Sequence, residues 1–465
     1  MTAATPSGAS LDVPPLAKEL GTRFAEAGHE LYLVGGTVRD LLLGREAQDW
    51  DFATDAHPPE ITRVLQGWAD RRYFVGVKFG TVGALKDGHL LEITTFREDV
   101  YVHEHRKPTV TFGKDLTTDL SRRDFTINAM AVRLPDGTFV DPFGGVKDLS
   151  ARSLETPLEP ETSFGDDPLR MLRAARFVAQ LDVVPSDRVV AAMRAMTERL
   201  DIVAPERLQG ELDRLLLAGH VAKGLELLVE TGLADVFLPE VPALRLEQDP
   251  VHRHKDVLRH TYAVVRETEP RLHLRLAALL HDIGKPATRQ ITPEGVSFHH
   301  HEVVGARMAR ERLSALRYPN VLIDDVCTLI ELHLRFHGYG EGWSDSAVRR
   351  YVRDAGHLLD DLNQLTRADV TTRNQRKADW FRRLQDELEE RIAALAAAEN
   401  LGAMRPPLDG RQVMEHLGLE PGPAVGEALA FLMEVRLDRG PTSEEEAYRL
   451  LDEWAEGRGI TRPDD

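Results

Sequence analysis

Two carboxylates separated by one residue are the clearest candidates for metal chemistry in the sequence. Asp49 and Asp51 flank Trp50 in the strand-like segment DWDFAT. Because alternate side chains of a strand project from the same face, these carboxylates would lie about 6 to 7 Å apart on one side. Mg²⁺ prefers carboxylate oxygens together with water and substrate phosphates, and a pair of such ions suits an in-line displacement at phosphorus. The spacing therefore predicts a Mg²⁺ site for phosphoryl-group chemistry.

A glycine pair precedes these carboxylates and predicts a place for phosphate. Gly35 and Gly36 follow the apolar run Leu31 to Val34 and begin the helical segment GTVRDLLLG. A phosphate can approach a glycine backbone closely, and the start of the next helix offers unpaired N–H groups to an anion. A glycine pair alone is commonly a turn, and an Asp-x-Asp alone is commonly a solvated strand edge. Their order along the chain predicts triphosphate binding beside the metal ions.

A third carboxylate follows in a predicted β-hairpin. The segment Phe74 to Phe96 alternates apolar and polar residues around an Asp87-Gly88 turn, and Glu92 falls in its second strand. Glu92 either faces water or, if the sheet brings it beside Asp49 and Asp51, serves as a third metal ligand. The polar stretch that follows, 95–112, is expected to be a mobile loop.

The segment LSRRDFTINAMAV, residues 120–132, joins cationic and hydrogen-bonding side chains. Arg122 and Arg123 have the fork geometry to clamp phosphate oxygens, and Asp124 could accept a hydrogen bond from a ribose hydroxyl. Asn128 follows four residues later. The competing interpretation is a cluster of surface ion pairs.

Asp167 and Arg170 are three residues apart on a predicted helix and could read a base. Adenine and cytosine both present an amino donor beside an unprotonated ring nitrogen, whereas guanine and uracil present the opposite pattern. A carboxylate and a guanidinium would therefore accept ATP and CTP and mispair with GTP and UTP. An intrahelical ion pair is the simpler alternative.

These motifs, in this order, resemble the class II nucleotidyltransferases, which comprise the CCA-adding enzymes and the bacterial poly(A) polymerases. The family's template motif has Glu where this chain has Asp166. The resemblance implies that Asp49 and Asp51 are catalytic, and Glu92 is the candidate for a third catalytic carboxylate. It implies nucleotide-binding roles for Gly35, Gly36, Arg39, Arg122, Arg123, Asp124, Asn128, Asp167, Arg170, Arg173 and Arg176.

The resemblance also implies a reaction. The expected activity is addition of C, C and A to the tRNA 3′ end from CTP and ATP with Mg²⁺. Family members that add only CC have a shortened flexible loop, whereas the polar stretch 95–112 is present here. A addition alone and poly(A) synthesis use the same residues and remain alternatives.

Histidines cluster later in the chain and predict a second metal site. The ordered set His260, His281, Asp282 and Asp369 resembles the HD phosphohydrolase superfamily, which implies that these four residues are metal ligands. Further histidines in the region are His301, His333 and His337. Imidazole with carboxylate suits Ni²⁺, Mn²⁺ or Zn²⁺. Such a domain could hydrolyse RNA ends or nucleotides, with the first domain only binding them, or could survive as a helical scaffold.

Composition limits the class of protein. The 465 residues carry a net charge of −18, so an RNA site would have to be a local basic patch, for which the segment from Arg373 to Arg383 is a candidate. Cys327, the single cysteine, excludes an intramolecular disulfide and is expected to be buried in a helix. No apolar run is long enough to span a bilayer, and the expected location is the cytoplasm.

The elements that must position these residues predict a multidomain α+β protein. A nucleotidyltransferase α/β head with a mixed sheet is expected first, followed by an all-α neck, an HD domain and a tail. In the neck, the helical segment that contains Arg207 and Glu211 resembles the family's helix that supports the nucleotide pocket, and a surface i,i+4 ion pair between these two residues is the alternative. The expected divisions are a disordered N-terminus over 1–15, the head over 16–150, the nucleotide- and RNA-binding neck over 151–245, the HD domain over 246–375 and the tail over 376–465.

Overall fold

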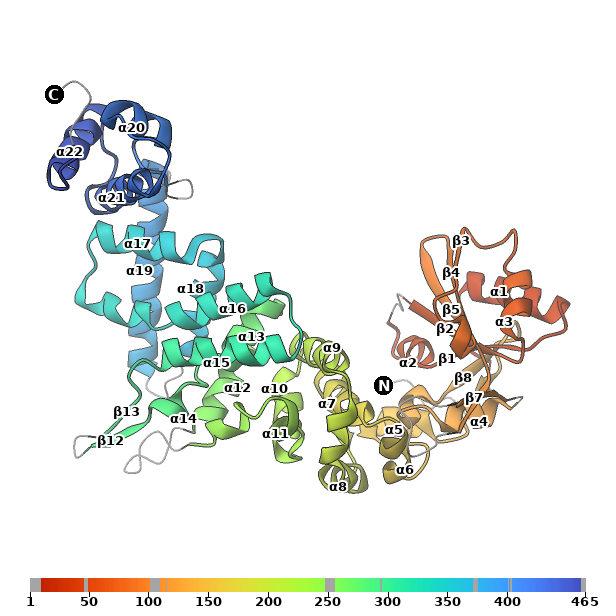
Figure 1. Ribbon diagram of the computed structural model, residues 1–465. Helices are drawn as coiled ribbons and strands as arrows, with labels where there is room; N and C mark the ends of the chain where they lie inside the picture. The colour runs from red at the N-terminus through yellow and green to blue at the C-terminus, as the bar shows by residue number, and fades with distance from the viewer. Residues whose placement is uncertain are drawn as a thin grey trace. The chain divides into compact units, whose positions relative to one another are not determined.

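The protein is described here from a computed structural model (Figure 1). The described residues are 10–45, 49–100, 109–113, 115–246, 256–292, 295–370, 375–399, 401 and 404–460. The chain divides into two compact units, Met1–Pro242 and Ala243–Asp465. The first unit contains the expected head and the expected neck up to Pro242, three residues before the end predicted for the neck.

A seven-stranded mixed sheet forms the centre of the head, as the sequence predicted. In sheet order its strands are β3 (Arg71–Tyr73), β4 (Thr81–Lys86), β5 (His89–Thr95), β2 (Asp49–Thr54), β1 (Leu31–Val34), β8 (Ala131–Leu134) and β9 (Phe139–Val140). The pair β2 and β5 is parallel, whereas the other neighbours are antiparallel. The predicted hairpin is β4–β5, whose turn residues Asp87 and Gly88 have φ angles of 50° and 82°. Two consecutive positive φ angles are typical of a tight hairpin turn.

Apolar side chains at helical spacing hold the head's helices on this sheet. The helices are α1 (Pro15–Glu26), α2 (Gly36–Leu42) and α3 (Pro58–Val64). Leu20 and Phe24 of α1 are fully buried in the same core as Leu31, Phe52 and Ile93 of the sheet. Their spacing of four residues places them on one face of α1, which is the face that the sheet covers.

Two segments that were expected to be irregular, 1–15 and 95–112, contain more regular structure than the sequence suggested. Ser10 forms a β-bridge with Thr138, and Val13 is buried, while residues 1–9 lie outside the described part.

The prediction of a loop over 95–112 was wrong at its ends. There β6 (Arg97–Val100) pairs with β7 (Thr109–Phe112) in an antiparallel ribbon, because backbone pairing outweighs the polar composition. Residues 101–108 lie outside the described part.

The remainder of the first unit is helical apart from the short parallel pair β10 (Ser153–Leu154) and β11 (Val184–Pro185). Its α-helices are α4 (Leu116–Ser121), α5 (Gly145–Ala151), α6 (Pro160–Asp166), α7 (Leu169–Leu181), α8 (Asp187–Ala195), α9 (Pro205–Leu216), α10 (Val221–Glu230) and α11 (Leu233–Phe237). A Cβ on Gly224 of α10 would lie 2.8 Å from the carbonyl oxygen of Ala175, so the missing side chain lets α10 pack closely on α7.

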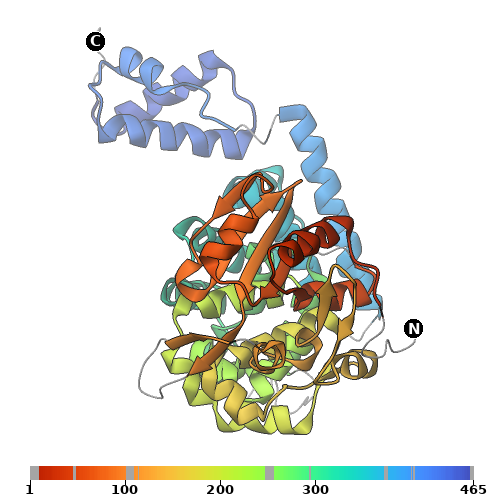
Figure 2. The same cartoon turned by 90° about the vertical axis from the view of Figure 1, so that its right-hand side faces the viewer.

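The second unit is helical, with one small hairpin formed by β12 (Gln290–Thr292) and β13 (Gly295–Ser297). Its helices are α12 (Val257–Glu267), α13 (Leu272–Leu280), α14 (Lys285–Thr288), α15 (His301–Ala315), α16 (Asn320–Leu332), α17 (Asp345–Ala355), α18 (Leu359–Asp369), α19 (Gln375–Glu399), α20 (Gly410–Leu417), α21 (Pro423–Arg439) and α22 (Glu444–Glu456). Figure 2 shows α19 as one long continuous helix. Cys327 is buried in α16, as predicted.

The last three helices share a hydrophobic core of their own, which includes Leu417, Leu432 and Trp454. Within the described residues, no helix combines the length and apolar character that crossing a membrane requires.

Candidate active site and metal centre

The sheet register brings the three head carboxylates together on two adjacent central strands. Asp51 of β2 lies opposite Glu92 of β5, and Asp49 lies two residues before Asp51. Thr37 at the start of α2 ties this region together, because its hydroxyl donates to the carbonyl of Asp49 and accepts from the N–H of Asp51. The arrangement joins residues from three separate segments of the chain.

The electrostatics of these carboxylates favour a cation. Burial raises the pKa of Asp51, and the neighbouring charges of Glu92 and Asp49 raise it further, while Arg123 opposes the shift. A raised carboxyl pKa means that the ionised form is unfavourable where it stands. A divalent cation would relieve this repulsion, so the residues present fit the Mg²⁺ site expected from the sequence.

Gly35 brings the backbone close to this site. Its φ and ψ angles are 73° and −141°, a conformation that residues with side chains avoid. A Cβ here would lie 2.9 Å from Nη1 of Arg123 and 3.5 Å from Oδ2 of Asp51. The glycine therefore keeps open the space between the carboxylates and the arginine.

A buried aspartate that the sequence analysis missed, Asp119, orients the adjacent side chains of Arg122 and Arg123. Asp119 of α4 accepts hydrogen bonds from Arg122 Nη2 at 2.7 Å and from Arg123 Nη2 at 3.3 Å. Its position three and four residues before the arginines, on one helix face, was the available signal. Burial opposes ionisation of Asp119, but the arginine charges prevail and hold its pKa below the ordinary value.

Asp124, expected to read ribose, is already fully engaged. Its Oδ1 accepts from the N–H of Phe125 and from Asn128 Nδ2, and its Oδ2 accepts from Nε and Nη2 of Arg173 at 2.8 and 2.5 Å. A carboxylate offers about four acceptor positions, so a ribose hydroxyl would have to displace one of these donors. Asn128 also accepts from Nη1 of Arg39, which links α2 to this network.

The paired state of Asp124 predicts an acid-sensitive contribution to stability. Burial opposes ionisation, but Arg173 and Asn128 hold the pKa of Asp124 well below its ordinary value. A depressed carboxyl pKa stabilises the fold above the unfolded-state pKa of about 4, and this contribution is lost as the pH falls below it. The stability difference between the native chain and Asp124→Asn is expected to shrink by roughly 1 kcal/mol between pH 5 and pH 3.

Thermal unfolding of both proteins at several pH values would measure this difference, and other acidic groups cancel in the comparison. A difference that stays constant over this pH range would contradict the prediction.

Three arginines surround the aromatic ring of Phe177, and two of them also approach a buried carboxylate of the neck. The guanidinium carbons of Arg39, Arg173 and Arg176 lie 5.5, 5.7 and 4.4 Å from the ring centroid of Phe177. Glu211 of α9 is 4% exposed and lies 3.0 Å from Nε of Arg176 and 3.6 Å from Nη1 of Arg173. Burial and the charge of Arg173 lower the pKa of Arg176 to about 10. The carboxylate of Glu211 therefore holds the two positively charged side chains of Arg173 and Arg176 close to each other.

Of the two interpretations of this helix, the surface i,i+4 pair between Arg207 and Glu211 was wrong. Glu211 points into the neck toward the arginines of α7, whereas Arg207 is exposed and reaches Asp167 at 2.8 Å. Tertiary packing decides which partner Glu211 takes, because buried ion pairs with two arginines contribute more than one exposed ion pair along a helix.

Substitution Glu211→Gln is expected to destabilise the first unit by about 3 kcal/mol, since it leaves Arg173 and Arg176 close together without their shared counter-charge. For a unit of this size the thermal midpoint should fall by about 10 °C. The matched control is Glu206→Gln, an exposed position in the first turn of the same helix. Equal midpoints for the two variants would show that the buried carboxylate does not bind the arginines together.

The two residues expected to read the base lie at the start of α7. Asp167 Oδ1 accepts from the N–H of Leu169, while its Oδ2 pairs with Arg207. Arg170 is buried and donates from Nη1 to Oγ of Ser163 at 2.9 Å and from Nη2 to the carbonyl oxygen of Arg122 at 2.5 Å. Arg170 therefore connects the base-reading position directly to the arginine pair of the head.

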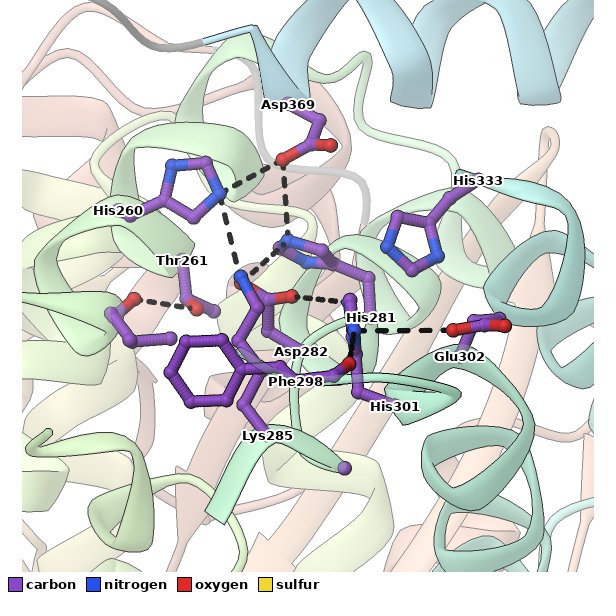
Figure 3. A network of polar contacts seen from close by, with 12 residues as sticks. His260, Thr261, His281, Asp282, Lys285, Phe298, His301, Glu302, His333 and Asp369 are labelled. Atoms are coloured by element: carbon purple, nitrogen blue, oxygen red, sulfur yellow. Dashed lines mark hydrogen bonds and ion pairs between the residues drawn. The ribbon is translucent and has the colours of Figure 1, made fainter. Parts of the chain in front are cut away.

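In the second unit, six metal-ligating side chains converge (Figure 3). They come from the three helices α12, α15 and α18 and from the turns that follow α13 and α16. They are His260, His281, Asp282, His301, His333 and Asp369. Gly284 permits this convergence, because a Cβ there would lie 2.1 Å from the carbonyl oxygen of His301. The four residues expected as ligands are thus brought together, and His301 and His333 join them.

Ion-pair distances within this cluster are short. Nε2 of His260 lies 2.9 Å from Oδ1 of Asp369, and Nε2 of His281 lies 3.2 Å from Oδ2 of Asp282.

Burial opposes protonation of His281, yet Asp282 and Asp369 raise its pKa to about 10. Burial and the charge of His281 lower the pKa of His333 to about 4. Lys285, which sequence analysis did not single out, lies 2.7 Å from Oδ2 of Asp282.

Three of the histidine rings present a buried nitrogen without a hydrogen-bond partner. These atoms are Nε2 of His281, His301 and His333. Each ring is oriented by its other nitrogen, Nδ1, which donates to the backbone carbonyl three residues earlier. An unsatisfied buried polar atom costs about 1 to 3 kcal/mol, so three together require an explanation. Rings held in this tautomer are the form in which histidine binds a metal ion.

The two sites differ in how closely their ligands approach. Among the described residues, the groups of three whose ligand atoms all lie within 4.8 Å belong to the second unit.

The start of α19 lies near this centre, since the ring of Phe381 contacts that of His337, and His337 lies 3.6 Å from Asp369. Of the basic patch expected over 373–383, Arg376, Arg382 and Arg383 line a hollow of about 500 Å³ together with Asp379, which pairs with Arg382, whereas Arg373 lies outside the described residues.

Comparison with known protein families gives three matches along the chain. Residues 31–155 match the poly A polymerase head domain. Residues 185–244 match the probable RNA and SrmB-binding site of polymerase A, and residues 255–414 match the HD domain.

Characterised relatives match nearly the whole chain. An A-adding tRNA nucleotidyltransferase from Deinococcus radiodurans is 35% identical over 91% of this chain and 95% of its own length. A CCA-adding enzyme from Geobacillus thermodenitrificans is 32% identical over 90% of this chain and 91% of its own length. The crystal structure of the Bacillus stearothermophilus CCA-adding enzyme in complex with CTP superimposes with a TM-score of 0.67 and 26% identity, over 96% of this chain and 99% of that one.

Proposed function

Because the chain belongs to the family of CCA-adding and A-adding tRNA nucleotidyltransferases, we propose that it adds C, C and A to the 3′ end of tRNA from CTP and ATP. The observation that carries this proposal is the meeting of Asp49, Asp51 and Glu92 on the adjacent strands β2 and β5, beside Gly35 and Arg123. We assign nucleotidyl transfer to the head, nucleotide and RNA binding to the neck and tail, and a separate metal centre to the HD domain.

In the proposed mechanism, Asp49, Asp51 and Glu92 would hold Mg²⁺ at the head. When bound, these ions would activate the tRNA 3′ oxygen and neutralise charge on the triphosphate. Gly35 leaves room for the phosphates to reach the carboxylates. Pyrophosphate leaves as the new phosphodiester bond forms.

The arginines recognise the nucleotide's phosphates and sugar. Asp119 pre-orients Arg122 and Arg123, so that they can donate to phosphate oxygens without a large entropic cost. Asp124 and Asn128 hold Arg173 and Arg39 in place, and a ribose hydroxyl can exchange with one donor of this network.

Asp167 and Arg170 read the base. The carboxylate of Asp167 accepts from the amino group of cytosine or adenine, while Arg170 donates to the adjacent ring nitrogen. Asp167 must release Arg207 to do so, a small cost because this ion pair is half-exposed. The contact of Arg170 with the carbonyl of Arg122 couples base reading to the phosphate-binding arginines.

The test is product length on three tRNA transcripts that end before CCA, after C and after CC, each incubated with Mg²⁺, CTP and ATP. Addition of three, two and one nucleotides, followed by a stop, supports the proposal. Extension of the CC-ending transcript alone would indicate an A-adding enzyme like the Deinococcus radiodurans relative. A long adenosine ladder with ATP alone would indicate poly(A) synthesis.

A second candidate activity is metal-dependent hydrolysis of phosphate esters by the HD domain. The unpartnered ring nitrogens of His281, His301 and His333 favour it, since metal-bound water at such a cluster is a nucleophile near neutral pH. Hydrolysis of a 2′,3′-cyclic nucleotide with Ni²⁺ or Mn²⁺ that is lost in Asp282→Ala would support this activity. Absence of hydrolysis with every transition metal tested would assign the domain a structural role.

A further inference from the structure

The sheet face that carries the head's carboxylates continues across β4 to the edge strand β3. We propose that the single-stranded 3′ end of the tRNA crosses this face and stacks one of its bases on Tyr73. The inference rests on the proposed nucleotidyl transfer and adds to it the position of the acceptor strand.

The strands β4 and β5 have one covered face and one open face. The side chains on the covered face are buried in the head's core: Val82, Ala84, Leu91 and Ile93. Gly83 and Glu92 alternate with them, so they belong to the opposite face, where Glu92 is exposed. On β3, Arg72 belongs to the covered face, since it lies opposite Ala84 and donates to the carbonyl oxygen of Thr62 in α3 at 3.0 Å. Its neighbour Tyr73 therefore belongs to the open face.

A row of opposed residues connects Tyr73 to the proposed metal site. Tyr73 lies opposite Gly83, which lies opposite Glu92. Glu92 in turn lies opposite Asp51. Directly opposed residues of neighbouring strands project from the same face of a sheet. Three strand spacings of about 4.8 Å separate Tyr73 from Asp51 by roughly 14 Å, a distance that a short single-stranded end can span.

Gly83 leaves the middle of this row without a side chain. A Cβ at Gly83 would lie 3.3 Å from Cβ and 3.6 Å from Cδ2 of Tyr73, so the tyrosine side chain lies directly beside the open position. Tyr73 is 41% exposed. A base can therefore reach the tyrosine ring from solvent, and the strand that carries the base can pass over the glycine toward Glu92.

The geometry of the reaction favours this side of the metal site for the acceptor. In an in-line displacement, the attacking oxygen and the leaving pyrophosphate lie on opposite sides of the phosphorus. The triphosphate is assigned to Gly35 and Arg123, and Gly35 directly follows β1. Figure 1 shows β5, β4 and β3 on the other side of β2 from β1. The 3′ hydroxyl is therefore expected to approach the carboxylates over these three strands.

The composition of β3, β4 and the turn between them fits a nucleic acid. Residues 71–86 include no acidic residue, although the whole chain has a net charge of −18. Arg71 and Lys78 are exposed, as are the aromatic side chains of Phe74 and Phe79 beside Tyr73. Aromatic rings interleaved with cations are typical of surfaces that bind single-stranded RNA, because bases stack on the rings. The excess of positive charge favours RNA over an apolar protein partner.

The first readout of the test is the fluorescence of 2-aminopurine, a base analogue whose emission falls when it stacks on an aromatic ring. Transcripts of tRNA that end in CC would carry it at one of the last three positions and bind the full-length chain without nucleotides. Quenching is expected at one or more positions with the native chain and with Tyr73→Phe, which keeps the ring. Tyr73→Ala should lose this quenching.

The second readout is steady-state incorporation of ATP into an unlabelled transcript that ends in CC. Tyr73→Ala should raise KM for the transcript by about tenfold, because stacking of a base on an aromatic side chain contributes at least this much to affinity. KM for ATP should stay unchanged. The matched control is Arg72→Ala, whose side chain lies on the covered face and which should behave like the native chain.

Retained quenching or an unchanged KM for the transcript in Tyr73→Ala would overturn the inference. An equal loss in Arg72→Ala would also overturn it, because the effect would then come from disruption of β3. Absence of incorporation by the native chain would instead count against the proposed function, and the quenching would still show whether RNA stacks on Tyr73.

Discussion

Replacing Asp49 and Asp51 with alanine is expected to reduce nucleotide incorporation by at least about 10³-fold. Charge stabilisation by bound metal contributes several kcal/mol to phosphoryl transfer, and each 1.4 kcal/mol corresponds to a factor of ten in rate. Incorporation of radiolabelled CTP and ATP into a tRNA transcript that lacks CCA would measure the loss.

The double variant should remain folded. Burial and the neighbouring carboxylates raise the pKa of Asp51, which means that its negative charge opposes folding at neutral pH. The thermal midpoint is therefore expected to stay the same or to rise slightly. The matched control is Glu26→Ala, an exposed acidic residue on α1 of the same head. Full incorporation by the double variant would refute the assignment of the metal site.

Replacing both Asp167 and Arg170 with alanine is expected to lower the preference for ATP and CTP over GTP and UTP by about 10²-fold or more. A hydrogen bond to a charged group contributes about 1.5 to 3 kcal/mol, and the variant loses one such bond from each residue. The loss should fall on kcat/KM for ATP and CTP, while the poor substrates GTP and UTP change little. Single-nucleotide incorporation with each of the four nucleotides would provide these values.

Arg207→Ala separates base reading from a merely structural role of Asp167. This substitution removes the ion pair of Asp167 but leaves both proposed base-reading side chains in place. It should retain the preference for ATP and CTP. A collapse of selectivity in Arg207→Ala as large as that of the double variant would mean that the ion pair, rather than contact with the base, carries selectivity.

Local sequence patterns predicted the elements of the head and their chemistry. The alternation of apolar residues and the Asp87-Gly88 turn predicted the β4–β5 hairpin, and helical spacing of Leu20 and Phe24 predicted α1. Such patterns are readable because side chains repeat every two residues in a strand and every 3.6 in a helix. Motif order was enough to predict the family, which the comparisons then confirmed.

Pairing between distant segments followed from no local pattern. The sequence left Glu92 either in water or beside the aspartates, and the parallel register of β2 and β5 sets it opposite Asp51. A surface pair of Glu211 with Arg207 was one interpretation of the sequence, whereas Glu211 contacts Arg214 of its own helix and the arginines of α7. Long-range pairings depend on which faces the fold buries, because a buried charge must find a partner wherever packing provides one.

The sequence by itself determined which residue types are available for chemistry: a carboxylate pair beside glycines, adjacent arginines, and an ordered set of histidines and aspartates. Only the tertiary structure decided how they combine. It turned Asp124 into the anchor of Arg173, and it added His301 and His333 to the four ligands expected from the sequence. The physical reason is that spacing along a chain fixes neighbours within one helix or strand, whereas contacts between elements depend on their packing.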